Sequence, residues 1–305
     1  MPITRKPGQR TATISLPKWP DDIVRKFNLK RYDFKPILPK GKAASLKGDK
    51  KKKKKAEYIT EAIPGYQIQH EINGDAIGFD EKGRLMFVFL KGVISERVRD
   101  RTLVGLRKME FRSCNKSGRP ELREAIRFNG HTNPEAGEIN TGYMHLAREF
   151  KIKQSARNER RLQFILPLLR AMDGRYQKVL PRQFGEQNRK IKAHHRHGFS
   201  PFSTLTFLRS APSAVHVDAR NGAGALACMT TIKPPSGSKG GEFCFVEYGL
   251  QIGVTPGDLL IAATPKHWHC NLSPVVGTKY SIICYFKDAL RKKPLTVPLP
   301  PPPVT

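Results

Sequence analysis

The sequence is poor in cysteine and has no long apolar run. It contains five cysteines, an odd number without a CxxC pair, which argues against both a disulfide framework and a zinc knuckle. We expect free thiols, most of them buried. No stretch approaches the roughly 18–20 apolar residues that cross a bilayer, and no apolar signal segment opens the chain. The sequence therefore predicts a soluble, intracellular protein without a membrane partner.

Acidic side chains are also scarce. Against 26 Asp and Glu stand 55 Lys and Arg, so the formal net charge is +29. Residues 201–305 carry 10 basic and 5 acidic residues, and residues 1–200 carry 45 and 21, so most of the excess lies in the first 200 residues. Such an excess favours a polyanionic partner, most often nucleic acid, although basic proteins also bind acidic proteins or lipid.

Composition divides the chain into three parts. Residues 1–56 are rich in Lys, Arg and Pro and include the lysine run Lys50–Lys55, so we expect a largely irregular basic arm that serves nuclear import, phosphate binding or both. A short helix is expected at Asp22–Leu29 within it. Residues 57–290 form the expected globular domain, and the Pro-rich residues 291–305 an extended tail. We expect a nuclear monomer.

Several elements are expected before residue 200. Residues 76–80 and 85–90 alternate around a tight turn and predict two strands. Apolar spacing predicts a helix over Ser95–Arg107 and a longer one over Ser155–Met172. Residues 112–145 are polar and rich in Gly and Asn, so we expect a long surface loop there.

From about residue 200 to 290 the pattern changes to short β-rich segments separated by turn residues. The expected strands are Thr204–Leu208, Ala223–Ile232, Glu242–Tyr248, Gln251–Thr255, Asp258–Ala262 and Tyr280–Phe286. Close spacing of this kind indicates an antiparallel sandwich or jelly roll rather than a βαβ fold. Together with the preceding helices, it predicts an α+β domain whose β core has flanking helices.

The candidate chemistry lies within this β-rich part. In His216-Val217-Asp218 the first and third side chains of an extended segment point the same way, so an imidazole and a carboxylate can reach one ion. His267 and His269 are also two residues apart, and spacing alone does not choose between them as the second imidazole. Two histidines and one carboxylate are the ligand set of mononuclear non-haem iron oxygenases.

A candidate for an anionic co-substrate follows. Lys279 and Ser281 lie ten and twelve residues beyond His269, on one face of the last expected strand. A cation and a hydroxyl side by side suit the distal carboxylate of 2-oxoglutarate. Each motif alone is weak, but their order along the chain narrows the interpretation: His-x-Asp, a glycine turn, Pro-Gly-Asp, a histidine and then Gly-x-Lys-x-Ser.

In this order of motifs, residues 202–286 resemble the Fe(II)/2-oxoglutarate-dependent dioxygenases, and more narrowly the compact fungal and protist members of the TET/JBP family. The asparagine at the fifth position after the first histidine, Asn221 followed by Gly222, carries the narrower resemblance. It implies a double-stranded β-helix (jelly roll) core over about residues 200–290, within a dioxygenase domain at 57–290. It also implies that His216, Asp218 and His269 bind Fe(II).

The resemblance further implies that Lys279 and Ser281 bind 2-oxoglutarate and that Asn221 touches the target base, with Arg220 beside it as a second candidate contact. Base-oxidising relatives usually carry Arg where this chain has Lys279. A lysine ten residues after the histidine is the habit of prolyl-hydroxylase-like enzymes, which favours His269 over His267 but weakens the substrate assignment. The cysteine-rich zinc region of animal members is absent.

The implied activity is oxidation of the methyl group of 5-methylcytosine in DNA with Fe(II), 2-oxoglutarate and O2. N6-methyladenine is a possible second substrate, from which the same hydrogen abstraction leads to demethylation. A methyl on a stacked base is out of reach, so the implied partner is methylated duplex DNA with a flipped base. Two alternatives remain: an oxygenase of the same fold acting on protein or RNA, and a non-catalytic basic nucleic-acid-binding protein.

Overall fold

The structure is a computed structural model, and it describes nine stretches of the chain. These are residues 19–38, 68–107, 124–128, 152–191, 200–209, 213–232, 239–271, 274–276 and 279–288. The lysine run at 50–55 and the Pro-rich tail lie outside them, as does most of the expected loop at 112–145. Within these stretches, no helix is both long and apolar enough to span a bilayer.

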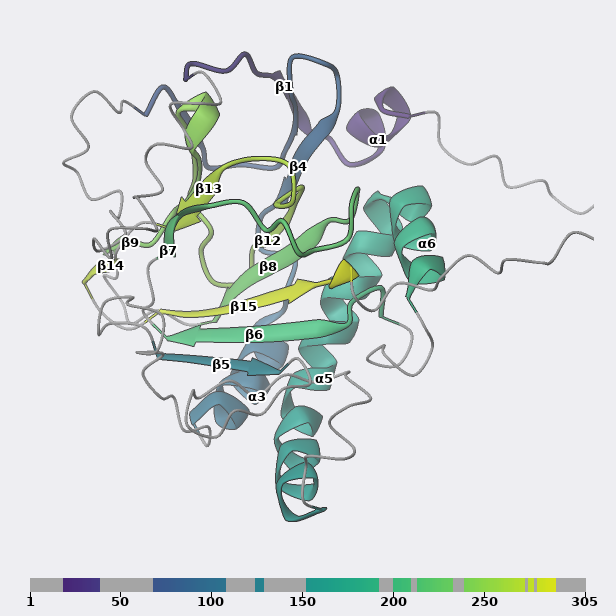
Figure 1. The fold of residues 1–305 in the computed structure, drawn as a ribbon, viewed down its shortest axis with the longest axis vertical. Helices are drawn as coiled ribbons and strands as arrows, with labels where there is room; N and C mark the ends of the chain where they lie inside the picture. Colours follow the sequence, from purple (N-terminus) through teal and green to yellow (C-terminus); the bar gives the residue numbers. More distant parts are fainter. Residues whose placement is uncertain are drawn as a thin grey trace, which may run out of the picture.

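Two β-sheets face each other in the centre of the fold (Figure 1). The larger has the order β1-β3-β4-β12-β8-β15-β6-β5 and the smaller β2-β11-β10-β13-β7. In the larger sheet the strands are β1 (Lys30–Asp33), β3 (Ala76–Phe79), β4 (Leu85–Leu90), β5 (Glu124–Phe128), β6 (Thr204–Arg209), β8 (Ala227–Ile232), β12 (Leu259–Ala262) and β15 (Tyr280–Tyr285). In the smaller they are β2 (His70–Ile72), β7 (Ser213–His216), β10 (Phe243–Phe245), β11 (Leu250–Ile252) and β13 (His269–Asn271). A separate pair joins β9 (Lys239–Gly240) to β14 (Pro274–Val276).

The chain from β6 to β15 winds between the two sheets as a jelly roll. Strands β6, β8, β12 and β15 belong to the larger sheet, and β7, β10, β11 and β13, which alternate with them along the chain, belong to the smaller. Their mutual pairings are antiparallel. This winding confirms the expected α+β class with a double-stranded β-helix core.

Segments outside the jelly roll extend both sheets. The β3–β4 hairpin, expected from the sequence, pairs with β12 through β4, and β1 adds a parallel edge strand next to β3. Within the expected basic arm, the short helix expected at Asp22–Leu29 is found as α1 (Asp21–Lys26), and β1 follows it as a strand that was not expected. Ile23, Leu29 and Phe34 of this segment are buried in the two hydrophobic cores.

A further correction concerns the region expected to be a surface loop. Residues 124–128 within it form β5, which pairs with β6 at the far edge of the larger sheet. Its residues, Glu-Ala-Ile-Arg-Phe, do not alternate between polar and apolar types, so the sequence carries no period-2 signal for this strand, and its place depends on the pairing with β6.

Three helices cover the outer face of the larger sheet, visible in the lower and right parts of Figure 1. They are α3 (Glu96–Arg107), α5 (Ile152–Val179) and α6 (Pro181–Lys190). Helix α5 runs well beyond the expected end at Met172, because Tyr176 and Val179 continue its buried stripe. Helix α6 was not expected. The side-chain amide of its buried Gln187 forms hydrogen bonds with backbone groups of Pro201 and Leu226, and these bonds attach the helix to the β core.

The second core fills the space between the two sheets. Phe87, Phe243, Phe245 and Leu260 belong to it, and Ile283 of β15 packs against it. Because side chains alternate along a strand, Lys279 and Ser281 lie on the same face of β15 as Ile283 and turn towards the interior of the jelly roll. The neighbouring Ile282 and Cys284 turn towards the helices.

Candidate metal centre

Two histidines meet where β7 and β13 pair. His216 ends β7, His269 begins β13, and the two are direct partners in the strand register. Their ring centroids are 4.3 Å apart. The strands lie side by side in the smaller sheet (Figure 1), so backbone pairing fixes the separation of two imidazoles that are 53 residues apart in the sequence.

The turn after β7 adds a carboxylate. The Asp218 amide donates to the carbonyl oxygen of Thr264 at 3.2 Å, which holds the turn against the segment leading to β13. One Asp218 oxygen lies 3.6 Å from Nε2 of His216 and the other 3.7 Å from Nε2 of His269. These three residues are the only group of three or more metal-binding side chains in the described stretches, with ligand atoms within 4.8 Å of one another.

The protonation states suit a metal ligand set. Burial lowers the pKa of His269 to about 4, with a smaller contribution from nearby His216. Its Nδ1 lies 3.0 Å from the carbonyl oxygen of His267, an acceptor, so the proton is assigned to Nδ1 and the Nε2 lone pair is left for a metal. Burial alone would raise the pKa of Asp218, but the hydrogen bond with His216 and the proximity of His269 hold it below its usual range. A neutral imidazole and an ionised carboxylate fit Fe(II).

His267 lies elsewhere. Its side chain is 2% exposed and packs edge-on against Phe245 and Tyr248. Its Nδ1 is 3.8 Å from the buried Glu247 carboxylate. The structure thus brings His269, and not His267, together with His216 and Asp218. The role of His267 near the cluster is a backbone one, since its carbonyl oxygen orients His269.

Lys279 lies in the interior of the jelly roll. The residue is 9% exposed, and its Nζ donates to the carbonyl oxygen of Gly241 at 2.5 Å. Burial lowers its pKa to about 8, against the opposing effect of Glu242. Ser281 is partly buried on the same face of β15, opposite Thr231 of β8. Lys279 and Ser281 are therefore two residues apart on the same side of the chain, both turned towards the interior of the jelly roll.

The two remaining predicted residues lie in the turn itself. The Asn221 amide nitrogen donates to an Asp218 carboxylate oxygen at 3.2 Å. Arg220 is exposed. Gly222 allows the turn to approach β15, because a Cβ at that position would lie 2.5 Å from the ring of Phe286.

One residue at the site was not singled out from the sequence. The ring of Phe243 in β10 is stacked on that of His269, with centroids 5.4 Å apart and 20° between the planes. Phe243 and Phe245 alternate with Cys244, a period-2 pattern that places both phenylalanines on the inner face. The pattern was available in the sequence, but the contact with His269 depends on the pairing of β10 with β13.

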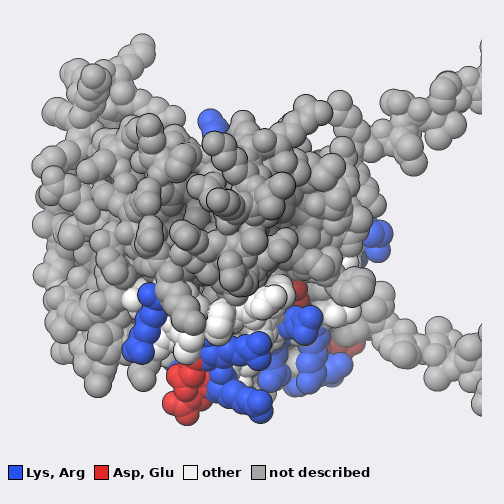
Figure 2. Space-filling model, turned by 90° about the horizontal axis from the view of Figure 1, so that it is seen from below, with Lys and Arg blue, Asp and Glu red and all other residues white. Residues whose placement is uncertain are grey.

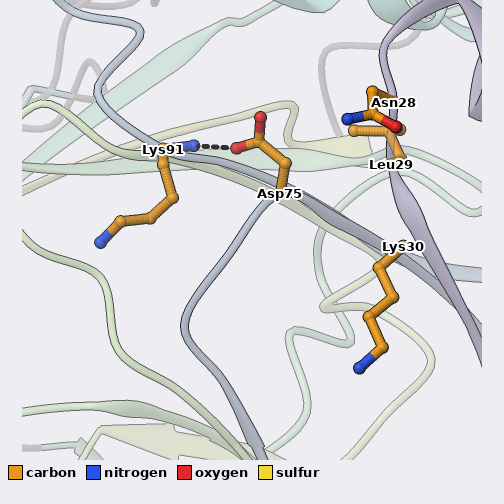
Figure 3. A pocket seen from close by; sticks show the side chains of 5 residues that line it. All are labelled: Asn28, Leu29, Lys30, Asp75 and Lys91. Atoms are coloured by element: carbon orange, nitrogen blue, oxygen red, sulfur yellow. Dashed lines mark hydrogen bonds between the residues drawn. The ribbon is translucent and has the colours of Figure 1, made fainter.

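A surface pocket of about 500 Å³ lies at the other end of the β3–β4 hairpin (Figure 3). Asn28, Leu29, Lys30, Asp75 and Lys91 line it. Asp75 precedes β3 and Lys91 follows β4, whereas the metal cluster lies near the start of β4, where Ala263 bonds to Met86. The Lys91 ammonium is 2.9 Å from the Asp258 carboxylate, so this pocket holds an internal ion pair and none of the cluster residues.

Comparison with known proteins finds a family match and a distant relative. Residues 129–288, just over half of the chain, match the TET/JBP family model, described as the oxygenase domain of the 2OGFeDO superfamily. Over 228 residues the chain is 23% identical to a Trypanosoma cruzi (strain CL Brener) protein named bifunctional helicase and thymine dioxygenase JBP2. The match covers 72% of the chain but 20% of the relative, so the chain spans about a fifth of that protein's length.

Two solved structures are similar to the chain at low identity. NgTET1 in complex with 5mC DNA is 12% identical, with a TM-score of 0.47, covering 84% of this chain and 94% of the other. The viral collagen prolyl hydroxylase of Paramecium Bursaria Chlorella virus-1, as its 2OG complex, is 13% identical, with a TM-score of 0.39, covering 67% and 96%.

Proposed function

Since the chain belongs to the TET/JBP family of oxygenases, we propose that it is a DNA base dioxygenase that oxidises the methyl group of 5-methylcytosine. As a member of the 2-oxoglutarate and Fe(II)-dependent superfamily it is an enzyme, with Fe(II) and 2-oxoglutarate as cofactors. Bound together with O2, these supply an oxidant strong enough to abstract hydrogen from a methyl group. The protein binds and positions the metal, the co-substrate and the base.

His216, Asp218 and His269 are proposed to hold the iron. They combine the required donor types with compact geometry, and ligand set and spacing are typical of iron sites that leave positions open on one side. The stacking of Phe243 on His269 and the hydrogen bond from His269 to the His267 carbonyl fix the imidazole plane. A ligand fixed in this way loses little conformational freedom on metal binding.

Lys279 and Ser281 are proposed to hold the distal carboxylate of 2-oxoglutarate. Ser281 lies on the inner face of β15, and Lys279 immediately precedes the strand on the same side. Burial lowers the pKa of the Lys279 ammonium to about 8, against the opposing effect of Glu242. A carboxylate bound beside the ammonium would favour its charged form further, so charge attraction would contribute to co-substrate binding.

The orientation of Asn221 carries the choice of base. An ionised carboxylate only accepts hydrogen bonds, so the contact with Asp218 assigns the amide nitrogen of Asn221 to that side and leaves its oxygen as an acceptor. At ring position 4 cytosine offers an amino donor, whereas thymine offers a carbonyl acceptor. The trypanosomal relative is named a thymine dioxygenase, and thymine carries the same 5-methyl group. The acceptor oxygen of Asn221 suits the 4-amino group of 5-methylcytosine, and we propose that it pairs with that group.

Basic side chains surround the proposed site. Arg189 and Lys190 end α6 and are exposed, and the next residue, Ile191, packs with Ala225 and Phe286. This contact places the end of α6 beside the turn that carries Arg220. We propose that Arg189, Lys190 and Arg220 contact DNA phosphates next to the target base.

Basic side chains also gather away from Arg189, Lys190 and Arg220, the three residues that we call the basic rim. Residues 152–191 contain ten basic and three acidic side chains. Figure 2, which views the molecule from the side where α3 lies, shows several lysine and arginine side chains close together with fewer acidic ones. Phosphate contacts by Arg189, Lys190 and Arg220 would offset the few kcal/mol needed to unstack a base and flip it into the site.

The test is direct. Purified protein with Fe(II), 2-oxoglutarate and O2 is incubated with matched duplexes carrying 5-methylcytosine, thymine or N6-methyladenine at one position, and the digested nucleosides are quantified by mass spectrometry. We expect 5-hydroxymethylcytosine and its further oxidation products from the first duplex, little product from thymine, and none after chelation of iron. The double variant H216A/D218A is the control and should abolish conversion.

Other outcomes separate the rivals. Consumption of 2-oxoglutarate on proline-containing peptides or RNA, without any oxidised DNA base, would replace the DNA proposal by an oxygenase of the same fold. Tight DNA binding without any turnover of 2-oxoglutarate would point to a binding protein. Conversion of N6-methyladenine alone would retain the chemistry and change the base.

Two further proposals concern localisation and oligomeric state. We propose that Lys50–Lys55, which lies outside the described stretches, directs the protein to the nucleus, and that the protein acts as a monomer. Replacement of the six lysines by glutamine in a fluorescent fusion should make the nuclear signal diffuse. Light scattering of the purified protein should give the mass of one chain, 34.4 kDa.

A further inference from the structure

Asn221 contacts a proposed metal ligand directly. Its amide nitrogen donates to Oδ2 of Asp218 at 3.2 Å, and its backbone amide donates to the Asp218 carbonyl at 2.8 Å. Oδ2 is the oxygen that lies 3.7 Å from His269, while Oδ1 faces His216. One amide group therefore distinguishes the two oxygens of the carboxylate.

Of the three proposed ligands, Asp218 has the least support from secondary structure. His216 and His269 sit in paired strands, and His269 is further held by the His267 carbonyl and the Phe243 ring. Asp218 lies in a turn, and its side chain is 31% exposed. A carboxylate on a turn can rotate about two side-chain bonds, so its direction depends on hydrogen bonds from its neighbours.

Asn221 is itself anchored well enough to give that direction. It forms an isolated β-bridge with Lys287, just beyond the end of β15. On either side of it, the Gly222 amide donates to the Phe286 carbonyl at 2.9 Å, and the Asp288 amide donates to the Arg220 carbonyl at 3.0 Å. The turn is thus hydrogen-bonded to the continuation of the strand that carries Lys279 and Ser281.

We propose that Asn221 is a positioning residue for the metal: its amide orients the Asp218 carboxylate, and its bridge to the end of β15 links the metal ligands to the co-substrate strand. This role is additional to the base contact through the other side of the same amide. It depends on the proposed metal ligands and not on DNA being the substrate. In this arrangement a change at Asn221 alters metal binding even when no base is present.

The experiment measures metal affinity without DNA. Mn(II) binding to the full chain is followed by calorimetry, and Co(II) binding by its visible absorption, which reports the ligand geometry. N221D keeps the size and turn preference of asparagine but removes the donor and places a second carboxylate beside Asp218. We expect Mn(II) affinity to fall about 10- to 100-fold, the range for losing a partner of a ligand, with a changed Co(II) spectrum.

Controls make each outcome decisive. N188D makes the same chemical change in α6, outside the metal cluster, and should leave both metal readouts unchanged. N221A removes the donor without adding charge and should also weaken Mn(II) binding. Circular dichroism verifies that each variant is folded. If N221A does not fold, the result for N221D decides. Folded N221D could instead lose base oxidation while it keeps wild-type metal affinity and an unchanged Co(II) spectrum. That result would overturn the positioning role of Asn221 and leave only its contact with the substrate. Unchanged metal binding in D218A would instead disprove the metal assignment itself.

Discussion

His216 and His269 are direct cross-strand partners, with 4.3 Å between their ring centroids, and the carboxylate of Asp218 lies against both. The two-residue spacing of His267 and His269 leaves either one possible as the second histidine. The strand register resolves this ambiguity, because β13 begins at His269 and pairs it with His216. The pairing determines which side chain reaches the ion, and the following prediction tests it.

H269A should abolish metal binding, whereas H267F should retain it. Removing a ligand should cost more than the roughly 100-fold that marks the loss of a partner of a ligand. H267F takes the imidazole Nδ1 away from the buried Glu247 carboxylate, 3.8 Å from it, so we expect lower stability but unchanged metal affinity. Mn(II) calorimetry and thermal unfolding check both variants, and the reverse order of metal affinities would show that His267 is the ligand.

The apparent affinity for 2-oxoglutarate should fall as pH rises above about 8. Burial lowers the pKa of Lys279 to about 8, so the side chain is charged below that pH and loses its attraction for a carboxylate above it. The KM for 2-oxoglutarate, measured between pH 6.5 and 9.5 at saturating DNA substrate, should therefore increase on the alkaline side. K279R keeps its charge throughout and should flatten this rise; an identical rise in K279R would show that another group titrates.

G222A should destabilise the protein. The added Cβ would lie 2.5 Å from the Phe286 ring, so the turn or the ring must move, at a cost of about 1–3 kcal/mol for overpacking. G174A is the matched control, because no atom lies within 4 Å of its added Cβ and alanine favours the helix by up to about 1 kcal/mol. Urea unfolding should move the two midpoints in opposite directions, and an unshifted midpoint for G222A would show that the turn has room.

D173N should stabilise the protein above pH 7 and change little near pH 4. Burial raises the pKa of Asp173 to about 7, so the folded state binds more protons than the unfolded state between pH 4 and 7, and stability from this group is lost as pH rises through 7. Asparagine is neutral and can still accept the hydrogen bond from Ser200. We expect a gain of roughly 2 kcal/mol at pH 8, about half of what the full pKa displacement corresponds to. Unfolding curves at the two pH values measure it, and equal gains at both would rule out titration as the cause.

Loss of the basic rim should reduce the salt dependence of DNA binding. If Arg189, Lys190 and Arg220 each contact one phosphate, their joint replacement by alanine should lower the slope of log affinity against log salt by about 2–3. R97A/R101A removes exposed charge from α3, which begins near Ile94 and Gly257 at the other end of the β core, and should change the slope less. Fluorescence anisotropy with a methylated duplex measures both slopes. Equal changes of slope in the two variants would show that Arg189, Lys190 and Arg220 contribute no more to DNA binding than other exposed arginines.

The sequence indicated much of the fold because local patterns carry that information. Alternation and turn residues predicted the hairpin of β3 and β4 and most strands after residue 200, and apolar spacing predicted α3 and α5. Strands β7 and β13 were not predicted as strands, although they carry the two histidines. Each is three or four residues long and contains too few residues for a periodic pattern. Strand β1 was missed because its pairing with β3 is a contact over more than 40 residues.

By itself, the sequence determined which residue types the site contains: one carboxylate two residues from a histidine, and a lysine two residues from a serine, in a β-rich segment of a strongly basic chain. Those are properties of spacing and composition, which any extended strand preserves. The tertiary structure alone decided that His269 and not His267 meets His216, and that Lys279 is buried. It also decided that the Asn221 amide faces Asp218. These facts depend on strand register and on hydrogen bonds between segments that are far apart in the sequence. A local pattern of residues does not specify such contacts.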